Sequence, residues 1–260
     1  MISFIKAYWK TLLFFTLVGL FGGFFTGLYL LESYPEEIRA QLLSEMAASG
    51  LPAALAKPLL GVVTALQSAL YGALLGAFGI FLGKKTGLWR DERALSKKPL
   101  LLTLALSLLS GLLMILPDML LFSHYSDAIR LSYASKPTLV NVLASVTYGA
   151  VIEEVMLRLF CMSLVAFFLV KLFAKGEAQP SVKHLMLANV ISSLLFALGH
   201  LPATALLIGI TPMSVLRCLL LNGGLGLIFG YLYRKYGLRY AMLAHGGCHI
   251  VSKLIWILFL

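Results

Sequence analysis

The stretch that decides the fold is residues 139–173, LVNVLASVTYGAVIEEVMLRLFCMSLVAFFLVKLF. A helix needs about 20 apolar residues to cross a bilayer, and this stretch is longer than that. It nevertheless contains Glu153, Glu154 and Arg158. An ionisable group in hydrocarbon costs roughly 3 kcal/mol even on lenient scales, so such groups usually serve a function. The stretch therefore indicates a transmembrane helix that carries a chemical site.

The rest of the chain is similarly apolar. Of its 260 residues, 60% are hydrophobic and 12% are charged, whereas soluble domains have about 25% charged residues. We predict an all-α protein, a polytopic membrane helical bundle with about 7–8 transmembrane helices, in which residues 1–260 form a single membrane domain. The expected helices lie near 12–31, 59–82, 99–122, 139–173, 184–200, 213–233 and 238–258. The fourth is long enough to be tilted, broken or extended beyond the bilayer, and 201–212, between Pro202 and Pro212, is a candidate re-entrant or interfacial segment.

The charges indicate a topology. The net charge is +10, and the basic residues gather in short loops between apolar stretches rather than on a soluble surface, which argues against a nucleic-acid partner. Alternate loops carry 14 and 4 of these Lys and Arg residues. The positive-inside rule then places the N-terminus in the cytoplasm. We expect an interfacial segment at 35–50, and we expect Asp118, Arg217 and Lys253 to lie near the outer surface, with the two basic side chains snorkelling.

Small residues mark a packing face in the first helix. Gly19, Gly23 and Gly27 recur at every fourth position. This spacing lets two helix backbones approach closely in lipid. We interpret these glycines as structural.

The two adjacent glutamates are expected to differ in role. Successive helix residues point about 100° apart, so the two carboxylates should not share one direction. Glu154 and Arg158 are four residues apart and should pair on one face. Glu153 is then left to face a cavity, where a carboxylate can act as a general base on water. The alternative is a purely structural ion pair, which would not need the second glutamate.

Three histidines complete the predicted site. His200 shares a helical stripe with Asn189, Ser193 and Phe196, and we expect this stripe to line a wet cavity. His245 and His249 are four residues apart and face one way, which suits metal ligation or an oxyanion role. Histidines that only stabilise helix packing are the alternative.

These residues resemble, in order, the motifs of the CPBP family (CAAX protease and bacteriocin-processing, or Abi). Glu153-Glu154-Val155-Met156-Leu157-Arg158 is similar to its EExxxR motif, and Phe196-Ala197-Leu198-Gly199-His200 to its FxxxH motif. His245, followed by position 249, is similar to the third motif. The resemblance covers residues 139–260, a CPBP-like catalytic core, and leaves the N-terminal helices of residues 1–125 without a role.

The resemblance implies an intramembrane endopeptidase, because the family includes the type II CAAX prenyl proteases. It implies that Glu153 and His200 activate the attacking water, that Glu154 pairs with Arg158, and that His245 and His249 stabilise the oxyanion. Position 249 departs from the family, which usually has Asn or Asp there. The leading interpretation needs no cofactor. The alternative is a divalent metal such as zinc, held by Glu153, His200, His245 and His249.

Three functions stay open at this point. The first is a hydrolase, a glutamate-type endopeptidase of a bacterial cytoplasmic (inner) membrane, acting on a peptide or protein substrate at the bilayer, lipid-modified or not. The second is a proton-coupled membrane transporter, and the third is a non-catalytic bacteriocin-immunity or scaffold protein of the same fold.

The predicted depths of the site residues conflict. Counted from the basic ends of the expected helices, His245 is shallow, whereas His200 and Glu153 are deep. We expect the fourth helix to project from the bilayer and the fifth to begin late, near Ala188.

Overall fold

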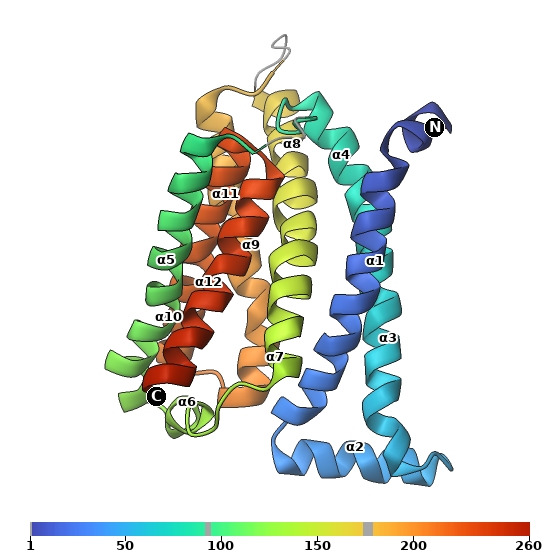
Figure 1. The fold of residues 1–260 in the computed structure, drawn as a ribbon, viewed down its shortest axis with the longest axis vertical. Coiled ribbons are helices and arrows are strands. Elements are labelled where there is room, and N and C mark those ends of the chain that lie inside the picture. The colour runs from blue at the N-terminus through green and yellow to red at the C-terminus, as the bar shows by residue number, and fades with distance from the viewer. Residues whose placement is uncertain (1, 92–94, 174–178) are drawn as a thin grey trace.

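The computed structural model describes residues 2–91, 95–173 and 179–260, and these residues form helices and connections without strands. Within these described residues, seven helical segments are long and apolar enough to cross a membrane, which confirms the predicted polytopic bundle. They are Ser3–Ser33, Ala53–Lys85, Lys97–His124, Leu139–Phe173, Val182–Ile208, Pro212–Tyr236 and Leu238–Phe259. Figure 1 shows the two termini at opposite ends of the bundle, as an odd number of crossings requires.

The elements follow one another in a simple order. The first segment is α1 (Ile2–Ser33), and the second consists of η1 (Ala53–Leu55), α3 (Ala56–Leu70), η2 (Tyr71–Leu75) and α4 (Gly76–Lys85). The third contains α5 (Lys97–Leu120) and η3 (Phe122–His124). The fourth contains α7 (Leu139–Ala144), η4 (Ser145–Glu153), η5 (Val155–Met162) and α8 (Ser163–Phe173). The last three are α9 (Val182–Ile208), then α10 (Pro212–Cys218) with η6 (Leu219–Gly224) and α11 (Leu225–Tyr236), and finally α12 (Leu238–Phe259).

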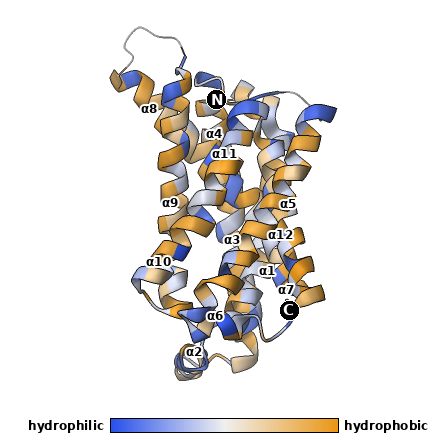
Figure 2. Cartoon of the chain, turned by 90° about the vertical axis from the view of Figure 1, so that its left-hand side faces the viewer, coloured by the Kyte–Doolittle hydropathy of each residue, from blue (hydrophilic) through white to orange (hydrophobic). Residues whose placement is uncertain are grey.

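Two short helices lie outside the crossings. α2 (Glu36–Ala48) falls within the predicted interfacial segment 35–50, and α6 (Asp127–Ser132) follows η3. Both lie at the end opposite the N-terminus, where α2 runs crosswise below α1 and α3 (Figure 1). Hydrophilic residues gather mainly at the two ends and apolar residues along the helices (Figure 2).

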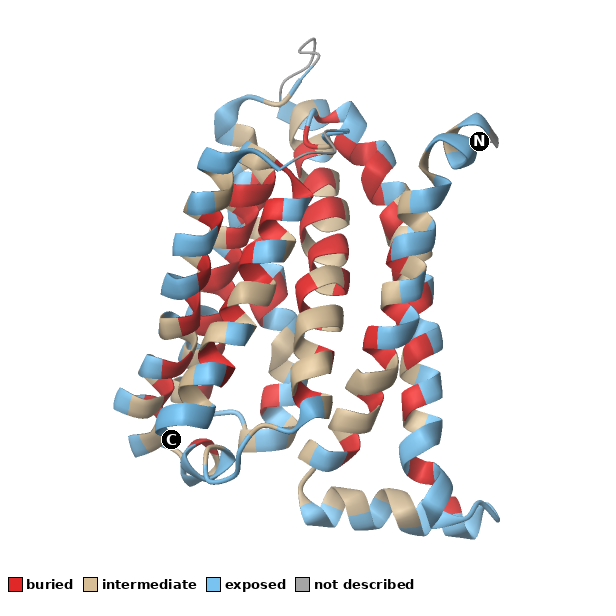
Figure 3. Ribbon diagram, viewed as in Figure 1, coloured by how far each residue is buried: buried red, intermediate tan, exposed pale blue. Residues whose placement is uncertain are grey.

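The first helix packs on α3 through the predicted glycine face. A methyl group at Gly23 would lie 2.5 Å from Ser68 Oγ, and one at Gly19 would lie 2.5 Å from the Ser68 carbonyl oxygen. The two backbones therefore approach as closely as glycine allows. Buried residues concentrate instead where α8, η5, α11 and α12 meet (Figure 3).

Two expectations about the fifth segment are wrong. α9 begins at Val182 rather than near Ala188, and it continues through Pro202 to Ile208, where Gly209 ends it with a φ of +78°. Residues 201–208 are thus ordinary helix, and 201–212 does not form a separate re-entrant segment. Proline removes one backbone donor and clashes with the preceding turn, but neighbouring helices allow it inside a membrane helix.

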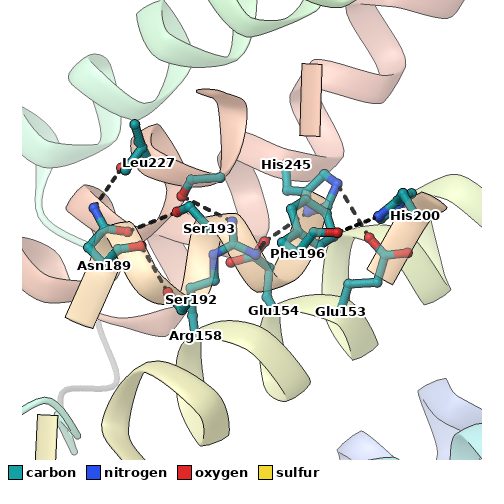
Figure 4. Close-up of polar contacts among 11 residues, drawn as sticks. Glu153, Glu154, Arg158, Asn189, Ser192, Ser193, Phe196, His200, Leu227 and His245 are labelled. Carbon is teal, nitrogen blue, oxygen red and sulfur yellow. Dashed lines mark hydrogen bonds and ion pairs between the residues drawn. The ribbon is translucent and has the colours of Figure 1, made fainter. Parts of the chain in front are cut away.

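The depth conflict is resolved by the position of α12. Glu153 lies 20 residues before the end of α8, and His200 lies 18 residues after the start of α9. Both are therefore about 30 Å from those ends, whereas His245 is only about 10 Å into α12. Figure 1 shows α12 beginning below the ends of α8 and α9. His245 Nε2 accordingly lies 4.0 Å from Glu153 Oε2, and Figure 4 shows His200 beside them.

Candidate active site

The two glutamates lie where two π-helical segments meet. Glu153 ends η4, Val155 begins η5, and Glu154 is the single α-helical residue between them. A π-helix closes its hydrogen bonds from i to i+5 and so turns less per residue than an α-helix, and such segments often occur at functional sites. This local geometry could not be predicted from the residues, because α and π segments share the same apolar composition.

The two carboxylates lie next to the two different nitrogens of one imidazole. His245 Nδ1 is 2.9 Å from Glu154 Oε1, and His245 Nε2 is 4.0 Å from Glu153 Oε2. A carboxylate can only accept, so His245 Nδ1 carries a hydrogen and donates it to Glu154. Figure 4 shows the His245 ring between the two acids. Glu153 thus faces a ring nitrogen across a gap that one small group can bridge.

The predicted ion pair is present and fully buried. Arg158 Nη1 lies 3.3 Å from Glu154 Oε1, and both side chains have no exposed surface. Arg158 Nη2 also donates to the Gly226 carbonyl oxygen at 3.0 Å. Its guanidinium lies over the Phe196 ring, 4.7 Å from the centroid, an arrangement that favours a desolvated cation. Arg158 therefore fixes Glu154, and through it His245.

His245 is also held by its neighbours on both ring faces. Phe229 of α11 stacks on it with centroids 4.6 Å apart, and His249 stacks at 4.9 Å. The contact with His249 follows from the spacing of four residues, whereas the contact with Phe229 does not follow from the motifs, because Phe229 is one of many apolar residues in its segment. The stacking leaves the His245 ring little freedom to turn.

His249 and Glu153 both lie beside Gly149. A methyl group built at Gly149 would lie 3.1 Å from His249 Nε2 and 4.0 Å from Glu153 Oε2. His249 Nδ1 is buried and has no hydrogen-bond partner among the described residues. Gly149 precedes Glu153 by four residues, so helical spacing could have identified it as a residue of the site.

His200 has one ring nitrogen occupied. Its Nδ1 is 2.8 Å from the Phe196 carbonyl oxygen, which can only accept, so Nδ1 carries the hydrogen and Nε2 has the lone pair. The ring stands edge-on to Phe196, with the ring centroids 4.7 Å apart. His200 lies on the same side of the cluster as the Glu153 carboxylate (Figure 4).

The polar stripe on α9 has a different role from the one expected. Asn189 Nδ2 donates to the Leu227 carbonyl oxygen at 3.0 Å, and Ser193 Oγ donates to Asn189 Oδ1 at 3.3 Å. Both residues are buried against α11 rather than lining a wet cavity. Of the stripe, Phe196 and His200 belong to the site, while Asn189 and Ser193 join two helices.

Metal ligation requires several donors around one point. Across the ranges that the structure describes, no three His, Cys, Asp or Glu side chains are placed so that they could hold a metal ion together. Glu153, His200, His245 and His249, the ligands expected for a metal, are therefore not arranged around one point in the described structure.

Comparison with known proteins agrees with the motifs. A family model described as "Rce1-like: Type II CAAX prenyl endopeptidase Rce1-like" matches residues 135–251. Neither a curated protein nor a solved structure gives a significant match. The family match confirms the resemblance to CPBP proteins and indicates, at the level of the family, a membrane endopeptidase similar to the CAAX proteases.

Proposed function

We propose that this chain, which carries the Rce1-like type II CAAX prenyl endopeptidase pattern over residues 135–251, hydrolyses a peptide bond in a membrane-associated substrate with a water activated by Glu153 and His200. The observation that carries the proposal is the 4.0 Å gap between Glu153 Oε2 and His245 Nε2. A water lying beside this pair could hydrogen-bond to both atoms and give up a proton to Glu153.

Glu153 is the proposed general base. Its side chain is 18% exposed, whereas that of Glu154 is fully buried and engaged by Arg158 and His245. Glu153 would take a proton as the water oxygen bonds to the scissile carbonyl carbon, and the leaving amine would receive that proton when the C–N bond breaks. The lone pair on His200 Nε2 gives a second acceptor for the same water.

His245 and His249 are the proposed oxyanion donors. Since His245 Nδ1 donates to Glu154, a hydrogen bond from Nε2 to an oxyanion requires the imidazolium form. The Glu154 carboxylate would offset that charge. His249 Nε2 lies beside the same carboxylate at Gly149, so two ring nitrogens converge on the place where charge would develop. Histidine at position 249 would thus replace the Asn or Asp of the family as a donor.

The substrate would be a peptide or protein held at the bilayer, lipid-modified or not. The N-terminal end of the bundle carries most of the loop Lys and Arg residues, so this end would face the cytoplasm under the positive-inside rule. A bacterial cytoplasmic (inner) membrane suits that arrangement.

The test is a survey of peptide termini in cell membranes that contain the wild-type chain or the Glu153→Gln variant, which keeps the shape of the side chain but removes the base. In the Glu153→Gln membranes, we expect the abundance of the peptide termini that depend on the wild-type chain to fall by roughly 100-fold or more. His200→Ala should lower their abundance as well. Glu45→Gln, an exposed acid at the far end, is the matched control and should behave as wild type.

Three results would contradict the proposal. Identical termini in all membranes would favour a non-catalytic scaffold. Proton-driven flux into liposomes that Glu153→Gln abolishes, without any cleavage, would favour a transporter. Stoichiometric zinc in the purified chain, with activity lost on chelation, would replace the glutamate mechanism by a metal-dependent one.

A further inference from the structure

Lys253 of α12 is a buried basic residue that the proposed mechanism does not use. It is only 8% exposed, and with the residues that the structure describes it forms neither an ion pair nor a hydrogen bond. Arg158 and Arg217, in contrast, each pair with a carboxylate. A basic group inside a membrane helix is costly when no partner offsets its charge, so its presence usually indicates a function.

Lys253 lies on the face of α12 that contacts η4. On this face, a methyl group at Gly246 would lie 3.3 Å from Ala150 Cβ, and His249 Nε2 would lie 3.1 Å from a methyl group at Gly149. Lys253 follows Gly246 by seven residues and His249 by four, so it belongs to the same face. Long side chains on a helix lean toward its N-terminus, which for Lys253 is the direction of His249.

A short peptide can span the distance between Lys253 and the carboxylate–histidine cluster. His245 precedes Lys253 by eight residues, which corresponds to about 12 Å along the helix axis. An extended peptide advances about 3.3–3.6 Å per residue, so three or four residues cover this distance. His249 lies between the two, and its buried Nδ1 has no hydrogen-bond partner among the described residues. A substrate extended along this face would reach Lys253 while its scissile bond lies beside Glu153.

We propose that Lys253 binds a carboxylate group of the peptide substrate, three or four residues from the scissile bond. A carboxylate would accept charge-assisted hydrogen bonds from the ammonium group and offset its charge. A neutral group at the same place would leave the buried cation without a counter-charge. The carboxylate would be the free C-terminus of the substrate or an Asp or Glu side chain. This inference rests on the proposed function, because the distance is counted from the bond to be cleaved.

Peptide binding to the full-length Glu153→Gln chain in phosphatidylcholine nanodiscs tests the inference, since binding does not require cleavage. The probes are N-palmitoylated octapeptide libraries that end in a carboxylate or an amide, each made with and without Asp and Glu. We expect affinity selection with mass spectrometry to retain peptides with a carboxylate roughly tenfold over the amidated library without acids. Enrichment of the free-acid library without Asp and Glu would assign the terminal carboxylate, and enrichment of the amidated library with them would assign a side chain.

The variant that tests the residue is Lys253→Met, made in the same Glu153→Gln chain. Methionine keeps a long flexible side chain and removes the charge, so the preference for carboxylates should be lost. The unfolding temperature should stay equal or rise, because an apolar side chain replaces a buried cation. Lys57→Met is the matched control, since it removes the same charge from an exposed residue near the start of α3, and it should keep the preference.

Three results would overturn the inference. Equal retention of acidic and neutral peptides by the Glu153→Gln chain would do so without any change at residue 253. A preference that persists in Lys253→Met would assign the carboxylate to another cation, and a preference lost equally in Lys57→Met would assign it to the net charge of the chain. Failure of the proposed function has a different result: the wild-type chain would cleave none of the peptides, although the preference for carboxylates and its loss in Lys253→Met would remain.

Discussion

Two ion pairs with a buried carboxylate lie at different levels of this bundle, and their hydrogen bonding differs. The Arg158 side chain is fully buried, whereas that of Arg217 is 25% exposed. Near the end opposite the N-terminus, Arg217 donates two hydrogen bonds of 2.6 Å to the Asp118 carboxylate, one to each oxygen. The Tyr133 hydroxyl donates a third, to Asp118 Oδ2 at 2.8 Å. Burial, and then the neighbouring Asp118, raise the pKa of Tyr133, so its hydroxyl stays protonated and available as a donor. Both carboxylate oxygens of Asp118 are satisfied.

The pair at the candidate site is less completely hydrogen-bonded. Arg158 approaches Glu154 only to 3.3 Å, and Glu154 Oε2 and Arg158 Nε have no hydrogen-bond partner within the described part of the chain. A second acid, Glu153, stands beside the pair and faces His245 instead of a guanidinium. A pair that only holds helices together can be satisfied completely, whereas a site must keep groups available for substrate.

The largest effect is expected from breaking the Glu154–Arg158 pair. Arg158→Met leaves Glu154 buried with only His245, and removal of one partner from a buried ion pair costs about 3 kcal/mol or more. It also frees the residue that orients His245, so we expect proteolytic activity to fall by roughly 100-fold or more. Thermal unfolding and counts of cleaved termini measure the two effects.

Arg158→Lys separates positioning from charge. Lysine keeps the cation but cannot reproduce the forked contacts to Glu154 and to the Gly226 carbonyl oxygen. We expect most of the stability and only part of the activity to return. Full activity in Arg158→Lys would mean that charge alone matters and that the guanidinium does not position His245.

Breaking the Asp118–Arg217 pair should affect stability alone. Asp118→Asn weakens two charge-assisted contacts to Arg217, at a cost of about 2–3 kcal/mol, and should lower the unfolding temperature. Activity per folded molecule should stay at the wild-type level, because Asp118 contacts none of the site residues. A loss of activity in fully folded protein would remove the distinction between the two pairs.

A smaller effect is expected at Gly149. In Gly149→Ala the new methyl group would lie 3.1 Å from His249 Nε2 and would narrow the space beside Glu153. We expect activity to fall about tenfold, with stability unchanged or slightly higher because alanine favours helix. Gly199→Ala is the control, because it adjoins His200 but has no atom within 4 Å of its added methyl group. Equal activity in both variants would place the substrate away from Gly149.

The smallest effect is expected from a surface pair. Lys57 contacts Glu32 at 2.5 Å, but their side chains are 45% and 32% exposed. Exposed ion pairs contribute about 0–1 kcal/mol, so Lys57→Gln should change the free energy of unfolding by less than 1 kcal/mol. A change in the free energy of unfolding as large as that of Asp118→Asn would show that burial does not decide how much these ion pairs contribute to stability.

The fold was largely predictable because hydrophobic length is a local property. The fourth membrane-spanning segment has the predicted bounds, 139–173, and the others differ by a few residues at most of their ends. The larger differences are at the start of the first segment, which begins at Ser3 instead of residue 12, at the start of the second, which begins at Ala53 instead of residue 59, and at the end of the fifth, which continues past Pro202. The glycine face of α1 was also predictable, because close helix packing in lipid requires small residues at regular spacing.

The polar interactions were predictable only within one helix. The pairing of Glu154 with Arg158 follows from their spacing, but the partner of Arg217 is 99 residues away in the chain. Arg217 and Lys253 were expected to snorkel, yet Asp118 holds Arg217, and Lys253 is only 8% exposed. Helix spacing does not show which side chains from other helices are close enough to make snorkelling unnecessary.

The sequence by itself determined seven apolar segments, the end that carries the basic loops, and the residues that share a helix face, because each depends on neighbours along the chain. Only the tertiary structure decided that α12 begins deep enough for His245 to reach Glu153 and Glu154. Only it decided that two π-helical segments meet at this pair. The physical reason is that helix offsets and local unwinding depend on packing between segments, and that packing brings two carboxylates to one imidazole.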